Sequence, residues 1–277
     1  MTVPSFEHLN VSLSDCGSVV HLEFDHGKAN EMGLPQLTEL ERLLDWLDGT
    51  GGIVALVSYS RRLSRKGTPI FIAGANVTER GDWEQDRVMA HVRWQRQVLT
   101  RLRNAPVFHI CVVGGVALGW GTEFLLTADY RLGADRAIFG LPETGLGILP
   151  GAGGTSELWM HIGIAHALRL GMTGERISAD EAGRIGLIQE RVVDISAGLE
   201  RAAVLCALAK GKSPTAAATF KRALLHSLGS ASEERMALES DAYEHCVRSG
   251  QAAIGRTHFD DIRKGKTPLW GGRVLLD

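Results

Sequence analysis

The first half of the chain alternates short apolar runs with longer segments in which apolar residues recur at helical spacing. Residues 19–25 (VVHLEFD) alternate apolar and polar side chains, as a half-buried strand does. Residues 52–60 and 107–117 are rich in β-branched and other apolar residues and are predicted to form buried strands. Helical patterns cover residues 35–48 and 83–104. This alternation predicts an α/β fold with helices covering a sheet.

The pattern changes after about residue 195. Residues 213–229 and 230–251 both show helical spacing, and no good strand pattern follows them. We therefore predict an α/β core over residues 1–195 and a helical region over residues 196–277.

The composition narrows the classes of protein that the chain can belong to. A length of 277 residues suffices for a sizeable core, and 44% apolar with 22% charged residues argues against global disorder. A net charge of −2 gives no basic surplus for nucleic acid. The four cysteines are scattered without a CxxC pair, and no signal-peptide pattern or apolar run of about 18 residues occurs. We expect a soluble cytoplasmic protein that binds neither nucleic acid nor membrane.

Several common catalytic motifs are missing from the sequence. It contains no phosphate-binding GxxxxGK[ST] loop and no GxGxxG fingerprint. It also contains no GxSxG nucleophile elbow and no HExxH zinc motif. We therefore predict no nucleotide cofactor, no serine nucleophile of this kind and no metal site.

Three segments share small residues at the end of a strand or within a loop, where backbone N–H groups can face a ligand. They are residues 71–76 (FIAGAN), 117–123 (ALGWGTE) and 139–155 (FGLPETGLGILPGAGGT). The second contains Glu123 and the third contains Glu143. Taken singly, Glu123 is explained equally well as an acid near a helix N-terminus, and Glu143 as a turn residue.

Together with residues 173–188 (TGERISADEAGRIGLI), these segments resemble, in order and spacing, the signature segments of the crotonase (enoyl-CoA hydratase/isomerase) superfamily. The similarity covers roughly residues 15–265. It implies a core of ββα turns coiled into a spiral, followed by C-terminal helices that trimerise, often as a dimer of trimers. It also implies acyl-CoA thioester substrates, so that coenzyme A arrives with the substrate and no metal or redox cofactor is needed.

The resemblance assigns roles to four positions of the chain. Ala75 and Trp120 match the residues whose backbone N–H groups bind the thioester oxygen in the superfamily. Glu123 and Glu143 match the two glutamates that handle one water molecule in its hydratases. We expect Glu123 to be the base, because a helix N-terminus favours its charged form, and Glu143 to be the acid or to position the water.

The presence of both glutamates favours a hydratase over the other reactions of the superfamily. Isomerases of the superfamily often work with one carboxylate, and its hydrolases use other nucleophile arrangements. Double-bond isomerisation and thioester hydrolysis stay as alternatives, because both use the same oxyanion hole. A non-catalytic protein that binds acyl-CoA is a further alternative.

Two residues depart from the superfamily's pattern. Trp120 stands where hydratases usually have glycine, and Asn76 stands where aspartate is common. A bulky residue would be strained if the turn required a positive φ at position 120. The indole either shapes the acyl site or packs away from the ligand.

The resemblance also suggests contacts with coenzyme A. Lys28 is a candidate for a phosphate or adenine contact and Ala73 for a contact with coenzyme A, and Phe259 with Lys264 could reach the adenine nucleotide from a neighbouring subunit. The alternatives are a solvated turn lysine at 28, a packing aromatic at 259 and a surface lysine at 264.

Overall fold

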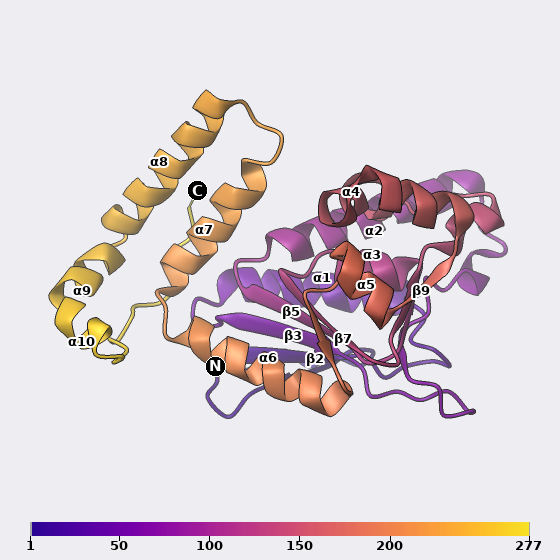
Figure 1. Cartoon of the computed structure of the whole chain (residues 1–277), viewed down its shortest axis with the longest axis horizontal. Helices are drawn as coiled ribbons and strands as arrows, with labels where there is room; N and C mark the ends of the chain where they lie inside the picture. The colour runs from indigo at the N-terminus through magenta and orange to yellow at the C-terminus, as the bar shows by residue number, and fades with distance from the viewer. Residues whose placement is uncertain (1, 277) are drawn as a thin grey trace.

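The computed structural model describes residues 2–276, and it contains two β-sheets with helices on both sides (Figure 1). The larger sheet has the strand order β1-β2-β3-β5-β7-β10 and the smaller sheet has the order β4-β6-β8-β9. The strands of the larger sheet are β1 (Asn10–Leu13), β2 (Val19–Glu23), β3 (Ala55–Tyr59), β5 (Phe108–Val113), β7 (Tyr130–Ala134) and β10 (Glu190–Val192). Those of the smaller sheet are β4 (Ile70–Ile72), β6 (Val116–Leu118), β8 (Ile138–Gly140) and β9 (Arg176–Ser178).

The connections between strands explain their directions. β1 and β2 form an antiparallel hairpin, whereas β2, β3, β5, β7 and β10 are parallel. Parallel neighbours need a crossover, and helices α1 (Leu34–Gly49) and α2 (Gln85–Asn104) supply two of them. These are the helices that the sequence pattern predicts over 35–48 and 83–104.

Each face of the larger sheet has its own core. The leucines of α1 that recur at helical spacing are buried in the main core, namely Leu37, Leu40, Leu43, Leu44 and Leu47. On the opposite face, α6 (Ile195–Lys210) packs Ala202 and Cys206 against Val57 and Ile110 of the sheet. Figure 1 shows α1 and α2 on one side of the strands and α6 on the other. The division of the chain at residue 195/196 stays a prediction.

The segment 107–117, predicted as one strand, is two strands. β5 ends at Val113 and pairs in the larger sheet, whereas β6 begins at Val116 and pairs with β4 and β8 in the smaller one. Helix α3 (Trp120–Leu125) follows β6 and lies against β4. A Cβ at Gly121 would come 2.1 Å from the carbonyl oxygen of Ile72, so only glycine allows this approach.

The rest of the chain is helical apart from the short strands already named. α4 (Gly154–Thr173) and α5 (Ala179–Ile185) lie beside the smaller sheet's loops, and two single turns, η1 (Thr78–Arg80) and η2 (Pro142–Leu146), precede α2 and α4. After α6 come α7 (Pro214–His226), α8 (Ser232–Arg248), α9 (Gln251–Thr257) and α10 (Phe259–Arg263). α7 to α10 stand to one side of the core in Figure 1. The predicted C-terminal helices are therefore present.

The end of the chain returns to the core. The guanidinium of Arg273 is buried and donates to the carbonyls of Leu47 and Thr50 at the end of α1, and to those of Ile53 and Pro106. The carbonyls that end a helix lack partners within the helix, so this side chain acts as a cap supplied from the far end of the chain.

Candidate active site

The turn before α3 sets the position of Trp120 and Glu123. Gly119 has φ 52° and ψ −121°, a conformation that suits glycine, and it redirects the chain from β6 into the helix. Thr122 Oγ1 donates to the carbonyls of Ala117 and Gly140, which fastens α3 to β6 and β8. As the first residue of α3, Trp120 has an N–H with no acceptor among residues 2–276.

The backbone of Trp120 is not strained by a positive φ, because the positive φ of this turn lies at Gly119. Among the described residues other than glycine, Asn30 is the one with positive φ. The Trp120 indole is 2% exposed and lies in the main core, with its ring centroid 5.6 Å from that of Phe124. This placement favours the alternative in which the side chain packs inward while its backbone faces the site.

Ala75 is held by a short parallel bridge to Met32. The N–H of Met32 donates to the Gly74 carbonyl at 3.0 Å, and the N–H of Asn76 donates to the Met32 carbonyl at 2.8 Å. Both bonds flank Ala75, whose own N–H has no acceptor within residues 2–276. Two fixed backbone donors without partners, at 75 and 120, are therefore available to a ligand.

Glu123 is buried, and its Oε1 accepts hydrogen bonds from the N–H groups of Ala152 (2.7 Å) and Gly154 (2.9 Å). Burial raises the pKa of Glu123 to about 7. The N–H of Gly154 acts in the opposite direction, and the charge of Glu143 raises the pKa further. The donors that favour the carboxylate thus belong to the start of α4, and they do not fully offset burial.

Glu143 projects from η2 toward the turn before α3. A Cβ built at Gly119 would lie 2.8 Å from Glu143 Oε1 and 3.9 Å from the Cα of Gly74. Glu143 Oε2 is buried without a hydrogen-bond partner in the described residues, and burial raises the pKa of this carboxyl. The structure therefore brings Glu143 to both backbone segments that carry the free N–H groups, and close enough to Glu123 to influence its pKa.

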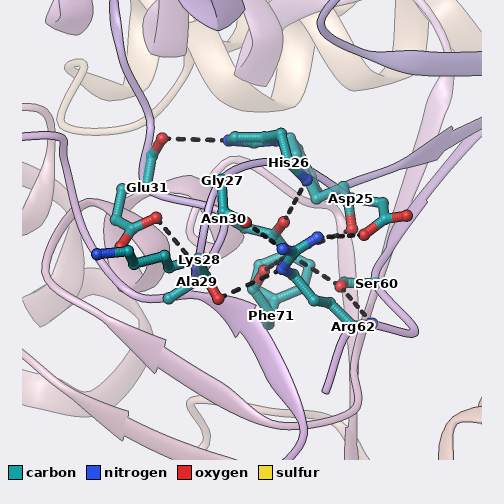
Figure 2. A network of polar contacts seen from close by, with 11 residues as sticks. Asp25, His26, Gly27, Lys28, Ala29, Asn30, Glu31, Ser60, Arg62 and Phe71 are labelled. Carbon is teal, nitrogen blue, oxygen red and sulfur yellow. Dashed lines mark hydrogen bonds and ion pairs between the residues drawn. The ribbon is translucent and has the colours of Figure 1, made fainter. Parts of the chain in front are cut away.

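The loop that carries Lys28 is fixed by a polar network (Figure 2). Asn30 is fully buried with φ 55°, and its Nδ2 contacts Ser60 Oγ (2.9 Å) and the carbonyl of Phe71 (2.8 Å), while its Oδ1 accepts from the N–H of His26 (2.9 Å). Arg62 donates to Asp25 and to the carbonyls of Gly27 and Lys28.

This loop lies directly beside the strand that leads to Ala75. The N–H of Ala73 donates to the Ala29 carbonyl at 3.0 Å, so Lys28 and Ala73 are brought together. The sequence predicts no role for Asn30, and it predicts Arg62 as part of a solvated basic loop with Arg61, Arg65 and Lys66. An asparagine in a small-residue loop was the available signal for Asn30, because asparagine tolerates a positive φ.

Phe259 and Lys264 lie apart from these residues. Phe259 is 58% exposed at the start of α10, and Lys264 follows the end of that helix. α10 contacts α9, and no hydrogen bond or ion pair joins either residue to the Lys28 loop in residues 2–276. The structure therefore does not bring Phe259 and Lys264 together with Lys28 and Ala73 within one chain.

Within residues 2–276, no three His, Cys, Asp or Glu side chains are grouped as a metal ion would require. No helix in the same range has the length and apolar character needed to cross a membrane.

The α/β core, with two buried glutamates beside two backbone donors that have no partner in residues 2–276, places the protein in the crotonase class of folds. A family model described as enoyl-CoA hydratase/isomerase matches residues 63–271, and the chain belongs to this family. Membership supports acyl-CoA processing as its general activity.

Relatives agree with this assignment over most of their length. The chain is 30% identical over 256 residues to a short-chain-enoyl-CoA hydratase of Clostridium acetobutylicum, covering 92% of this chain and 96% of that protein. It is 31% identical to the putative enoyl-CoA hydratase/isomerase YngF of Bacillus subtilis, covering 85% and 88%. The crystal structure of an enoyl-CoA hydratase from Bacillus anthracis superposes with a TM-score of 0.87 at 29% identity, covering 96% of this chain and 100% of that one.

Proposed function

We propose that this protein adds water to 2-enoyl-CoA thioesters. The observation that carries the proposal is the pair of buried glutamates, both with raised pKa values, next to the N–H groups of Ala75 and Trp120, which have no acceptor in the part of the chain that the structure describes. One carboxylate is enough for a double-bond shift within the substrate, whereas two can handle both protons of a water molecule.

The two N–H groups bind the thioester oxygen in this proposal. Addition at the β-carbon moves the double-bond electrons toward the thioester, so that negative charge builds up on this oxygen. Fixed donors stabilise that charge without having to reorganise, and each is worth about 2.7–4 kcal/mol in comparable oxyanion holes. Ala75 and Trp120 have such donors, and they directly follow Gly74 and Gly119, two glycines that lie close together.

The glutamates divide the proton transfers. Glu123 accepts a proton from water as the water oxygen bonds to the β-carbon, and Glu143 gives a proton to the α-carbon. Two neighbouring carboxyl groups do not readily ionise together, so one of them holds a proton near neutral pH. A pKa of about 7 for Glu123 is close to the best value for a base that works at neutral pH.

The test is the loss of enoyl absorbance with crotonyl-CoA and a longer 2-enoyl-CoA. We expect turnover by the wild type and a loss of at least about 100-fold in kcat for both Glu123→Gln and Glu143→Gln, in line with general acid–base contributions. Glu239→Gln is the control, because Glu239 is exposed on α8.

Other outcomes identify the alternative reactions. Conversion of 3-enoyl-CoA to 2-enoyl-CoA without hydration would indicate an isomerase, and release of free CoA thiol would indicate a hydrolase. Binding of CoA esters without any turnover would indicate a non-catalytic protein. Each of these results contradicts the hydratase proposal.

We further propose that Lys28 and Ala73 contact coenzyme A and that the chain forms a trimer or a dimer of trimers. Large apolar side chains are exposed on α4 and α7, including Trp159 (48%), Ile164 (65%) and Phe220 (70%). Contiguous exposed apolar surface is typical of subunit contacts. Light scattering coupled to gel filtration should give three or six times the chain mass, and a monomer would contradict the proposal.

A cytoplasmic location is proposed on the state of the cysteines. All four (Cys16, Cys111, Cys206 and Cys246) are free thiols. Unpaired cysteines are typical of a reducing compartment.

A further inference from the structure

Asn30 is a fully buried polar residue that the proposed mechanism does not use. Its φ of 55° is the one positive value among the described residues other than glycine. Such a conformation costs free energy, persists only where the surrounding structure holds it, and is concentrated at functional sites. The contacts of Asn30 therefore decide whether it has a role at the candidate site.

The side-chain amide of Asn30 joins the two β-sheets (Figure 2). Its Nδ2 lies 3.1 Å from the carbonyl oxygen of Phe24 and 2.9 Å from Ser60 Oγ, and these residues directly follow β2 and β3 of the larger sheet. The same nitrogen lies 2.8 Å from the carbonyl oxygen of Phe71, the middle residue of β4 in the smaller sheet. All of these residues are buried, so water does not compete for the contacts. One side chain thus fixes β4 relative to the larger sheet.

The same residue closes its own loop. Asn30 Oδ1 accepts from the N–H of His26 at 2.9 Å, and the N–H of Asn30 donates to the His26 carbonyl at 3.1 Å. The positive φ turns the chain between Ala29 and Met32, and both of these residues bond to the segment that follows β4. The conformation of Asn30 therefore determines how the loop faces that segment.

The hydrogen bond made by Met32 sets the direction of the Ala75 N–H. The Gly74 carbonyl and the Ala75 N–H belong to one planar trans peptide group, so they point in opposite directions. The N–H of Met32 donates to this carbonyl at 3.0 Å, and the next N–H, that of Asn76, donates back to the Met32 carbonyl at 2.8 Å. With its carbonyl held toward Met32, the peptide group directs the Ala75 N–H away from the loop.

We propose that Asn30 is a positioning residue for the backbone donor at Ala75. The inference rests on the proposed function, in which this N–H binds the thioester oxygen. Asn30 does not touch the substrate; it acts through β4, Met32 and the peptide group before Ala75. The energy of a hydrogen bond falls steeply as its angle departs from linearity, and a donor stabilises the transition state only where it is already aimed at the oxygen.

The first experiment observes the donor without chemistry. Infrared difference spectra are recorded for hexanoyl-CoA with carbon-13 at the thioester carbonyl, a saturated ester that has no double bond to hydrate or shift. Hydrogen bonds to a carbonyl oxygen lower its stretching frequency. We expect a lower frequency in the wild-type complex than in solution, and a loss of part of this shift in Asn30→Gly. Glycine adopts the positive φ without strain, so the variant removes only the side chain.

Two further variants distinguish positioning from general stability. Asn30→Asp retains the oxygen that accepts from His26 and the size of the side chain, but it lacks the Nδ2 donors, so it should lose the same part of the shift. Arg273→Met removes buried hydrogen bonds at the end of α1, none of which involves the loop of Asn30. It should retain the whole shift even where it unfolds more easily.

The second experiment measures hydration of crotonyl-CoA at a temperature at which circular dichroism shows every variant folded. A small misplacement of a catalytic group can cost about 100-fold, as can the loss of one oxyanion donor. We therefore expect Asn30→Gly and Asn30→Asp to lower kcat about 10- to 100-fold, with a smaller change in KM, and Arg273→Met to leave kcat unchanged.

Several results would overturn the inference. A full frequency shift in Asn30→Gly, with or without normal turnover, would show that Asn30 does not position the donor. The same loss of shift in Arg273→Met, or failure of both Asn30 variants to fold, would show that Asn30 serves the fold alone. The absence of any shift in the wild type would show that no such donor acts on the thioester.

The two experiments also separate this inference from the proposed function. If the wild type shifts the carbonyl frequency and Asn30→Gly loses the shift, but no enoyl ester is hydrated, the proposed function fails and the positioning role stands. If the wild type hydrates crotonyl-CoA and Asn30→Gly retains both the shift and kcat, the positioning role fails and the proposed function stands.

Discussion

At the scale of the residue, Glu123 shows how opposing effects set one pKa. Burial favours the neutral acid, and the N–H groups of Ala152 and Gly154 favour the carboxylate. The sequence predicts a charged Glu123 from its place near the start of α3. The structure shows that burial is the larger effect, and that the donors come from residues 29 and 31 positions away. No local pattern could have revealed those donors.

The raised pKa has a consequence for stability. The folded protein binds the carboxyl proton of Glu123 more tightly than the unfolded chain does. The contribution of Glu123 to the free energy of unfolding is therefore fully present below the unfolded pKa of about 4.5, and it is lost as pH rises through the folded pKa of about 7. Glu123→Gln removes this dependence. Between about pH 4.5 and pH 8.5, the wild type should lose about 3 kcal/mol of unfolding free energy relative to the variant.

Urea unfolding at a series of pH values measures this difference. Glu239→Gln should follow the wild type at every pH, because Glu239 is exposed. Parallel pH curves for wild type and Glu123→Gln would show that the Glu123 pKa is the same in the folded and unfolded protein.

At the scale of the element, the connection from β6 to α3 depends on Gly119. Alanine at this position would have a backbone conformation that costs about 1–3 kcal/mol, and its methyl would displace Glu143 Oε1. We expect Gly119→Ala to lower the unfolding free energy by about this amount and to lower enoyl-CoA turnover at least about tenfold. Thermal unfolding and turnover assays measure the two effects.

Gly171→Ala is the matched control for Gly119→Ala. Gly171 lies in α4 with open space around its Cα, so alanine there should stabilise the protein by about 0.5–1 kcal/mol and leave turnover unchanged. Normal turnover in Gly119→Ala would contradict the placement of Glu143 against this turn.

The same elements show where prediction from sequence ends. The helices over 35–48 and 83–104 are confirmed, because each has an apolar face that recurs over several turns. The strand predicted over 107–117 is wrong, since an apolar run does not reveal that its two halves join different sheets. Three-residue strands such as β4 and β8 are too short for any period to be recognised.

At the scale of the whole molecule, Arg273 joins the end of the chain to the core. Its hydrogen bond to the Ile53 carbonyl spans 220 residues of sequence, so no local pattern predicts it. Arg273→Met would leave four carbonyls without this donor, and a buried acceptor without a partner costs about 1–3 kcal/mol. We expect a loss of at least that size in urea unfolding, with Arg256→Met, at an exposed position on α9, as the unaffected control.

An unchanged unfolding midpoint in Arg273→Met would mean that water replaces the guanidinium at these carbonyls. The hydrogen bonds of Arg273 would then fix the position of the chain around residue 273 without adding to the free energy of unfolding of the whole protein.

The close approach of Gly121 to the Ile72 carbonyl has a bearing on how this protein can evolve. Any side chain at position 121 would separate α3 from β4, so selection for activity would hold this position to glycine as strictly as it holds the two glutamates. A catalogue of substitutions that abolish activity would therefore contain a residue that touches no reactant. Position 121 requires glycine because the backbones of α3 and β4 lie close together there. Loss of activity on substitution would not by itself tell this structural requirement from a catalytic role, whereas the structure does.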